Sequence, residues 1–153
     1  MIRKATLHDL EAIVAGNATM ALETEGIALA PETLQAGVRA VLAGRAPATY
    51  YVLEEDGRVL AQLLITHEWS DWRNADVWWI QSLYVWPEQR RRGLFRELYR
   101  AVLEEARAAG AAGLRLYVHD SNQRAQATYA ALGMHGGRYR VFEARFDEPP
   151  GRE

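Results

Sequence analysis

The chain has 153 residues, enough to bury a full hydrophobic core but too few for two ordinary domains. Its 18 basic and 20 acidic residues give a formal net charge of −2, which argues against a chain-wide role in coating nucleic acid or anionic membrane, because such binding depends on summed positive charge. The absence of cysteine excludes disulfides, thiol nucleophiles and thiolate metal sites. No apolar run approaches the roughly 20 residues that cross a bilayer, and the N-terminus lacks a signal-peptide core, so we expect a cytoplasmic protein without a membrane partner.

The N-terminal part of the chain predicts a short strand followed by a helix. Residues 2–5 are strand-like, and Thr6 and Asp9 have the spacing of a capping box. Apolar residues then recur at helical intervals to about Glu23, and Gly26 ends the helix.

A second helix is predicted to begin at Pro31, where a missing N–H group costs nothing. Gly44 is its expected end. Its buried stripe consists of Leu34, Val38, Val41 and Leu42.

From residue 50 the apolar period becomes that of strands. Two runs, residues 50–55 and 58–66, flank Asp56-Gly57, a strong signal for a short hairpin. The polar segment 67–76 is expected to be a loop, and the apolar residues 77–85 a further strand.

The C-terminal half alternates helices and strands. A helix is predicted from Leu94 to about Gly110, then a strand over residues 114–119. Asn122 should cap a shorter helix that Gly133 closes. A last strand is predicted over residues 138–146, and residues 148–153 are expected to be a frayed tail.

The predicted order is therefore β, α, α, β, β, β, α, β, α, β. Hairpins followed by a strand-helix-strand crossover predict an α/β (α+β) fold: a mixed, mostly antiparallel twisted sheet with helices on both faces. We expect one domain over residues 1–147.

The segment after the strand 77–85 has the features of an anion site. Three arginines and Gly93 precede the predicted start of a helix, where unpaired N–H groups and the positive end of the helix dipole favour anions. The segment lacks the Gly-Lys-Ser/Thr ending of a Walker loop and the spacing of a dinucleotide fingerprint. A pyrophosphate could bind its backbone, although a solvated basic turn or a nucleic-acid patch would also fit its charge.

Two motifs together resemble the GNAT superfamily of acyl-CoA-dependent N-acyltransferases. In that family a strand is followed by Arg/Gln-x-x-Gly-x-Gly/Ala, which Arg90 and Gly93 match, whereas Phe95 stands where Gly or Ala is usual. About 30 residues later the family has Asn-x-x-Ala-x-x-x-Tyr-x-x-x-Gly. This chain has the second motif at Asn122, Ala125, Tyr129 and Gly133.

The resemblance implies a fold of the GNAT type and a set of residues that contact coenzyme A. Backbone groups of the strand before the loop would pair with the pantetheine arm and polarise the acetyl carbonyl, and backbone amides of the loop would hold the pyrophosphate. The implied contacts are Leu83, Tyr84, Val85, Arg90, Arg91, Arg92, Gly93, Leu94, Phe95, Asn122, Ala125 and Tyr129.

Tyr129 has two readings. On helical spacing alone it is a core aromatic. The resemblance implies that its phenol lies near the coenzyme sulfur and protonates the departing thiolate, which its chemistry allows.

The general base is not singled out by the sequence. Gln81 stands where many relatives have a glutamate in the strand, and an amide cannot take a proton. Glu68 is one substitute, Glu23 or Glu25 another, and His119 could act through water. Each of these carboxylates could equally be a solvated surface group.

Four tryptophans within 11 residues, Trp69, Trp72, Trp78 and Trp79, suggest an aromatic wall. Alternation predicts that Trp79 shares a face with Gln81 and Leu83. With Glu23, Glu25 or Glu68 nearby, Trp69 and Trp79 would suit a cationic or aromatic amine. Core packing and a homodimer interface are the alternatives.

The resemblance therefore implies an N-acetyltransferase that moves an acetyl group from acetyl-CoA directly to a primary amine of a small molecule or peptide. Tyr129 would act as general acid, and neither a metal nor nucleic acid would be needed. The alternative is a non-catalytic acyl-CoA sensor, which Gln81 favours because it removes the usual base.

Overall fold

The structure is a computed structural model that describes residues 1–147. Its contacts divide the chain into two compact units, Met1–Tyr117 and the segment from Val118 onward. The predicted frayed tail, residues 148–153, lies outside the described residues.

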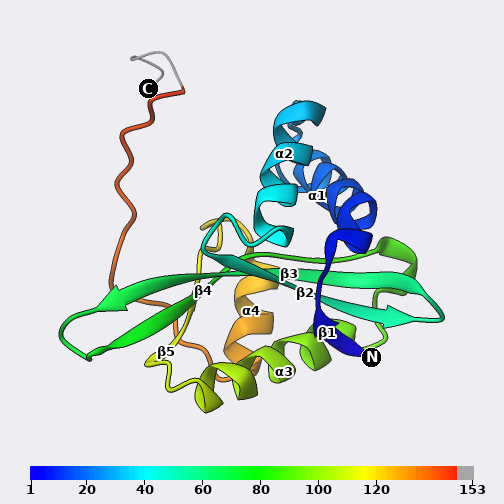
Figure 1. The fold of residues 1–153 in the computed structure, drawn as a ribbon. Coiled ribbons are helices and arrows are strands. Elements are labelled where there is room, and N and C mark those ends of the chain that lie inside the picture. The colour runs from blue at the N-terminus through cyan, green and yellow to red at the C-terminus, as the bar shows by residue number, and fades with distance from the viewer. Residues whose placement is uncertain (148–153) are drawn as a thin grey trace. The chain divides into compact units, whose positions relative to one another are not determined.

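The first unit is built on a five-stranded mixed sheet whose strands follow chain order (Figure 1). The neighbours β1 to β4 pair antiparallel, and β4 pairs parallel with β5 because a helix crosses over between them. The predicted mixed, mostly antiparallel sheet is confirmed. The strands are β1 (Ile2–Lys4), β2 (Ala48–Glu55), β3 (Arg58–Ser70), β4 (Ala75–Val85) and β5 (Gly113–Leu116).

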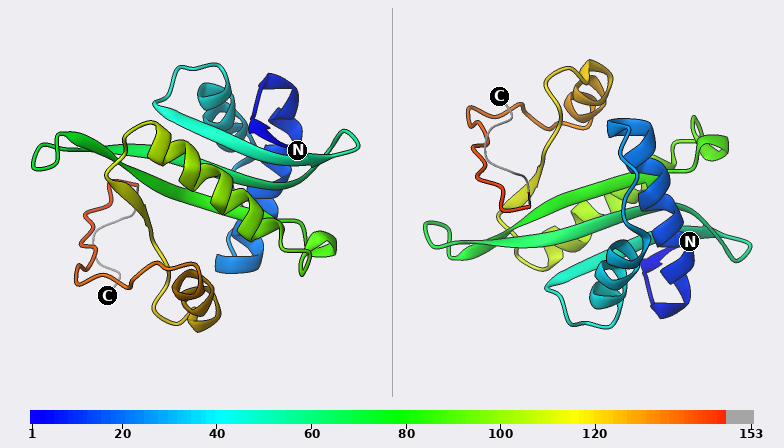
Figure 2. Two further views of the ribbon diagram at one scale, coloured as in Figure 1. Left: turned by 90° about the horizontal axis from the view of Figure 1, so that it is seen from below. Right: turned by 90° about the horizontal axis from the view of Figure 1, so that it is seen from above.

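Helices cover both faces of this sheet. The helices α1 (Leu10–Glu25) and α2 (Pro31–Leu42) lie on one face, and α3 (Leu94–Ala108) lies across the other (Figures 1 and 2). On the α1 face, Ile13 and Val38 pack against Val52 of β2. On the α3 face, Leu98 and Val102 are fully buried. Among the described residues, no helix has the length and apolar character needed to cross a membrane.

The helix ends follow the predicted local chemistry. The Thr6 N–H group donates to Asp9 Oδ2 at 2.7 Å, as in a capping box, and α1 begins at the next residue. The helix runs two residues beyond the predicted end at Glu23 and stops at Gly26, whose φ of 65° is the left-handed conformation of a C-cap. Pro31 is the first residue of α2, as predicted.

The predicted hairpin is confirmed, but the loop that should follow it is mostly strand. Asp56 and Gly57 both have positive φ, 49° and 74°, as a type I′ turn requires. Residues 67–70 and 75–76 extend β3 and β4, and only residues 71–74 turn. The prediction was wrong because these polar residues pair across the ladder, where one face of the sheet meets solvent.

A bulge interrupts β4 in its middle. Ile65 of β3 pairs with Ile80, whereas the preceding Leu64 pairs with Ser82. Gln81 is therefore an extra residue of β4 with no residue opposite it in β3.

The bulge places Leu83 and Trp79 on opposite faces of the sheet. Directly paired residues share a face, and Leu63 pairs with Leu83 just as Ile65 pairs with Ile80. Leu63 and Ile65 are two residues apart, so all four side chains share the α3 face. The prediction that Leu83 shares the face of Trp79 was wrong because it assumed an uninterrupted alternation.

The same bulge ends the pairing between β4 and β5. The parallel ladder runs from Val77 opposite Gly113 to Ile80 opposite Leu116, and it stops just before Gln81. The strand predicted over residues 114–119 therefore ends three residues early, at Leu116. In the part of the chain described, residues 81–85 continue β4 without a strand on that side.

The second unit contains α4 (Gln123–Ala131). Asn122 caps it as predicted, because its Oδ1 accepts the Ala125 N–H group at 3.0 Å. The predicted strand over residues 138–146 does not form: these residues are irregular, and Tyr139 and Phe142 are more than 90% exposed. An alternating pattern becomes a strand only where another strand supplies hydrogen bonds, and none pairs with this segment within residues 1–147.

Candidate active site

The end of β4 leads into a loop of unusual backbone conformation. A single 3-10 turn, Pro87–Gln89, follows the strand. Arg91 has a φ of 67° and Gly93 a φ of 80°, and α3 begins at Leu94. Left-handed conformation is costly for a residue with a side chain, so its presence at Arg91 marks a backbone held in a particular shape.

The loop leads directly into the first turn of α3, whose backbone N–H groups can bind an anion. The first N–H groups of an α-helix have no partner within the helix, and the helix dipole adds partial positive charge there. With Gly93 as the N-cap residue, the chain can be approached closely at this point. The arrangement suits a phosphate or pyrophosphate.

The three arginines have different partners. Arg90 donates to Glu23 Oε2 at 2.7 Å and to the Val85 carbonyl at 3.0 Å. Arg92 donates to both carboxylate oxygens of Glu55, at 2.8 and 3.0 Å. The side chain of Arg91 is exposed and makes no ion pair or hydrogen bond within the described residues. Of the three guanidinium groups, that of Arg91 is therefore the one that can bind a ligand without giving up a contact within the described residues.

Phe95, the departure from the usual family pattern, lies in the first turn of α3. Its side chain is half-buried. The ring is thus partly withdrawn from solvent.

Glu23, Tyr84 and Arg90 form a cluster that joins the end of α1 to β4 and the loop. The Tyr84 hydroxyl donates to Glu23 Oε1 at 3.1 Å, and the Arg90 guanidinium lies 5.6 Å from the centre of the Tyr84 ring. Burial raises the pKa of Tyr84, and the hydrogen bond to Glu23 raises it further. The hydrogen bond to Glu23 also raises the pKa of Arg90. The sequence carried no signal for this cluster, because Glu23 is 61 and 67 residues away from its partners.

A second cluster occupies the same face of the sheet on the other side of the bulge. Arg115 Nη1 donates to Glu68 Oε2 at 2.8 Å, and its guanidinium lies 6.0 Å from the centre of the Trp79 ring. The ring of Trp79 packs against that of Tyr117, with centroids 4.6 Å apart.

The predicted site residues Glu68, Trp79 and Gln81 thus share this part of the sheet. Gln81 Nε2 donates to Thr66 Oγ1 at 2.7 Å, and Thr66 pairs with Trp79 across β3 and β4. Sequence analysis missed Arg115 and Tyr117, although their alternation with apolar residues placed them on one face of a strand.

The four tryptophans do not form a single wall. Trp78 is buried on the α3 face, where its ring packs edge-on against His67 at 5.1 Å. Trp69 alternates with His67 along β3 and so lies on that face too, away from Trp79. Trp72 is 91% exposed in the turn between β3 and β4. Glu25, the last residue of α1, is exposed.

The second predicted motif lies on α4 in the second unit. Asn122 and Ala125 form the cap at its start, and Tyr129 is half-buried in its later part. Burial raises the pKa of Tyr129, so its phenol stays protonated well above neutral pH. His119 Nδ1 lies 2.7 Å from Ser121 Oγ in the segment before the helix.

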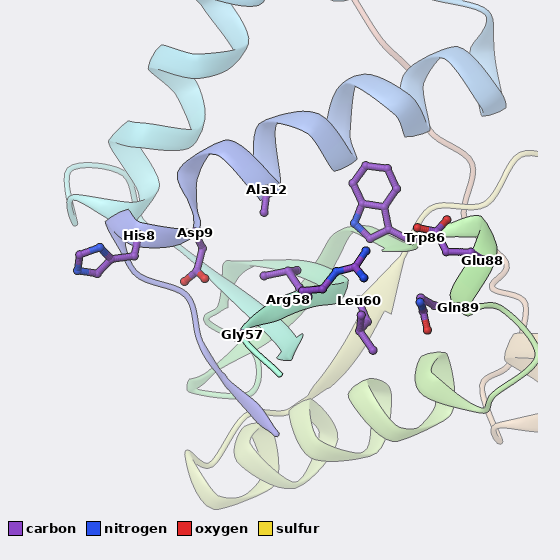
Figure 3. A pocket seen from close by; sticks show the side chains of 10 residues that line it. His8, Asp9, Ala12, Gly57, Arg58, Leu60, Trp86, Glu88 and Gln89 are labelled. Atoms are coloured by element: carbon purple, nitrogen blue, oxygen red, sulfur yellow. The ribbon is translucent and has the colours of Figure 1, made fainter. Parts of the chain in front are cut away.

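Two cavities of the first unit lie apart from these clusters. The larger, of about 410 Å³, lies between the start of α1 and the turn between β2 and β3 (Figure 3). Arg58 reaches across it toward Trp86 (Figure 3). None of the residues predicted to bind coenzyme A lines it. A smaller cavity of about 300 Å³ lies beside Trp69 and Trp78. In the portion of the chain described, no three His, Asp or Glu side chains are grouped to hold a metal ion.

Comparison with known proteins identifies the family. Residues 18–134 match the family described as Acetyltransferase (GNAT) family. A segment of 65 residues, 42% of this chain and 38% of the relative, is 37% identical to the thialysine N-epsilon-acetyltransferase of Bos taurus. The matched segment thus spans less than half of that protein.

Solved structures extend the similarity to nearly the whole chain. A possible acetyltransferase from Clostridium difficile 630 is 38% identical, with a TM-score of 0.91 over 97% of this chain and 98% of that one. An aminoglycoside N-acetyltransferase in complex with CoA has the same fold, with a TM-score of 0.77 at 17% identity over 95% of this chain and 94% of that one. The fold predicted from the two motifs is confirmed. The chain belongs to the acetyltransferase (GNAT) family of enzymes.

Proposed function

We propose that the protein transfers the acetyl group of acetyl-CoA directly to a primary amine while both substrates are bound. The observation that carries the proposal is the departure of β4 from β5 at the Gln81 bulge, just before a loop in which Arg91 and Gly93 have positive φ. A strand edge without a strand partner offers N–H and C=O groups to an extended ligand. The pantetheine arm of coenzyme A carries amides suited to such an edge.

The proposed coenzyme site has three parts. Backbone groups of residues 83–85 would pair with the pantetheine arm, and residues 90–95 would hold the pyrophosphate through backbone N–H groups. Arg91 would add a charge-assisted contact to a phosphate, because its guanidinium has no partner among the described residues. Asn122 and Ala125 are the proposed contacts from α4. Because the family match runs across both units, we propose that residues 1–147 act as one domain.

The proposed chemistry needs one acid and a route for one proton. The neutral amine attacks the thioester carbon, the new C–N bond forms, and strand N–H groups stabilise the oxyanion. The C–S bond then breaks, and the Tyr129 phenol donates its proton to the thiolate. Burial raises the pKa of Tyr129, and a phenol is protonated at neutral pH with or without this shift, so the proton needed by the thiolate is present. The proton that the amine loses would leave through water or a carboxylate, for which Glu68 and Glu23 are candidates.

The acceptor is proposed to be an aliphatic primary amine. The relative from Bos taurus is named for acetylation of an ε-amino group. The Glu68 carboxylate and the Trp79 ring, on the same face as the bulge, would attract a cationic amine.

The direct test is thiol release from acetyl-CoA across a panel of primary amines, with mass spectrometry of the products. We expect amine-dependent release and an acetylated amine, and we expect coenzyme A to raise the melting temperature. A coenzyme-dependent shift without acetylation of any amine would support a sensor. The proposal would be contradicted if coenzyme A caused no shift in melting temperature, no amine caused thiol release, and the protein bound nucleic acid in a salt-sensitive way.

A further inference from the structure

The ion pair between Glu68 and Arg115 bridges over β4. Glu68 lies on β3 and Arg115 on β5, on either side of β4, where Glu68 is opposite the buried Val77 and Arg115 is opposite Trp79. The two side chains are 51% and 41% exposed, with 2.8 Å between nitrogen and oxygen. Both charges are therefore accessible from solvent, and an exposed pair of this kind contributes little to stability.

An aromatic surface lies directly beside the two charges. The rings of Trp79 and Tyr117 are 4.6 Å apart with 40° between their planes, and Tyr117 is 61% exposed. Arg115 lies over Trp79. Adjacent positive, negative and aromatic groups fit a ligand that has both charges and an aliphatic stem.

A short stretch of β4 separates these side chains from Ser82, just past the Gln81 bulge, where the strand edge proposed to bind the pantetheine arm begins. From Trp79 to Ser82 the strand advances roughly 7 to 10 Å, at about 3.3 Å per residue with the bulge included. A ligand held at Glu68 and Arg115 could therefore place an amine at the end of a four- or five-carbon stem next to the bulge. Gln81 and Thr66, which are joined by a hydrogen bond of 2.7 Å, lie along this stretch of the sheet.

We propose that the Glu68–Arg115 patch (Glu68, Trp79, Arg115 and Tyr117) binds the α-amino acid group of the acceptor. Its α-ammonium pairs with Glu68, its α-carboxylate pairs with Arg115, and its stem crosses Trp79 toward the bulge. In this arrangement Glu68 does not reach the reacting amine, so water or Glu23 is left to take the proton of that amine. This inference rests on the proposed function and narrows the acceptor to amino acids with a terminal amine. Binding would separate Glu68 from Arg115, and an acceptor with both charges gives each of these side chains a new partner. An acceptor with only one of the charges leaves Glu68 or Arg115 without a partner.

Three matched acceptors test the inference in thiol-release kinetics. L-lysine has both charges, cadaverine lacks the α-carboxylate, and ε-aminocaproate lacks the α-ammonium. We expect kcat/KM for L-lysine to exceed that for each of the other two by about tenfold or more.

Two variants assign the charges separately. Arg115→Gln should lower the preference for L-lysine over cadaverine about tenfold, and Glu68→Gln should lower the preference for L-lysine over ε-aminocaproate by a similar factor. The matched control is Arg107→Gln, which breaks the exposed Arg107–Glu104 pair on α3 and should change neither ratio. Because each readout is a ratio of acceptors in one variant, a general loss of folding cannot imitate it.

The outcomes separate this inference from the proposed function. Turnover of amines with ratios that Arg115→Gln and Glu68→Gln leave unchanged overturns the inference and keeps the function. If none of the three amines is turned over, calorimetric titration of L-lysine into the coenzyme A complex decides. Binding that both variants weaken supports the inference and counts against the function, and absence of binding overturns the inference.

Discussion

At the scale of single residues, Gly16 marks the closest approach of α1 to the sheet. The buried Gln62 amide donates from Nε2 to the Ile13 carbonyl at 3.1 Å and to Asn17 Oδ1 at 2.9 Å. A Cβ atom at Gly16 would lie 2.3 Å from Gln62 Oε1 and 2.7 Å from its Cδ. No real side chain tolerates such contacts, so any larger residue at Gly16 must displace Gln62 or α1.

Gly16→Ala should therefore lower the free energy of unfolding by about 1 to 3 kcal/mol, the usual cost of overpacking. Urea denaturation measures it. The control is Gly37→Ala on α2, where a Cβ meets nothing within 4 Å. This control should leave stability unchanged or raise it by up to about 1 kcal/mol, because alanine is the better helix former. Equal effects of the two variants would contradict the packing role of Gly16.

Tyr129 is the residue on which the proposed chemistry depends. Tyr129→Phe should lower kcat by about 100-fold and leave the KM for acetyl-CoA nearly unchanged, because the hydroxyl acts only as the thiolate departs. Steady-state kinetics at saturating amine measure both constants. Tyr139→Phe, which alters an exposed ring of the same unit, should change neither. An unaltered kcat in Tyr129→Phe would remove this residue from the mechanism.

At the scale of elements, the junction between the loop and α3 depends on Gly93. Its φ of 80° is costly for any residue with a Cβ, although a Cβ there would meet no atom within 4 Å. Strain in the backbone, and not a steric clash, is thus the expected effect of a substitution. Its relief would rotate the N–H groups proposed to face the pyrophosphate.

Gly93→Ala should raise the KM for acetyl-CoA several-fold and lower stability by about 1 kcal/mol. Gly44→Ala is a matched control, since Gly44 also has positive φ, 71°, and open space around it, but follows α2. It should cost similar stability and leave the KM for acetyl-CoA unchanged. Kinetics and urea denaturation on the same samples separate the two effects. If both variants raise the KM equally, the loop has no special role in coenzyme binding.

What could be predicted from sequence was local. The Thr6–Asp9 capping box just before α1, the Asp56-Gly57 turn and the cap at Asn122 are each set by residues a few positions apart, and the structure confirms them. The bulge at Gln81 depends on how two strands align, which an alternating pattern does not encode. The error over residues 138–146 has the same origin, because a strand exists only with a partner.

The site follows the same division. The Gly93 loop was predicted from adjacent residues. The Glu23–Arg90 contact joins residues far apart in the chain, and no spacing in the sequence announces it. The Glu68–Arg115 pair likewise depends on β3 and β5 flanking β4 in the sheet. Sequence motifs thus suggested the proposed coenzyme contacts, whereas the side chains of the proposed acceptor site could be grouped only from the fold.

At the scale of the whole molecule, buried tyrosines should make stability depend on alkaline pH. Burial raises the pKa of Tyr50, Tyr51 and Tyr99, and for Tyr51 the hydrogen bond to Glu105 raises it further. Unfolded tyrosine releases its proton near pH 10, at about its ordinary pKa. Above that pH the folded chain holds more protons than the unfolded chain. The contribution of these tyrosines to the free energy of unfolding is therefore fully present below about pH 10, and it is lost as pH rises through their folded-state pKa values.

Tyr51→Phe should make this alkaline loss shallower, because one proton is removed from the difference between the folded and unfolded states. A single such group changes the slope by up to about 1.4 kcal/mol per pH unit. Urea denaturation on both sides of about pH 10 measures the slope, which is informative even if losing the contact with Glu105 lowers stability at every pH. Tyr139→Phe is the control, because its ring is 91% exposed and should leave the slope as it is in the original chain. Equal slopes in both variants would mean that Tyr51 gains no protection from burial, and that the alkaline limit of the fold is set elsewhere.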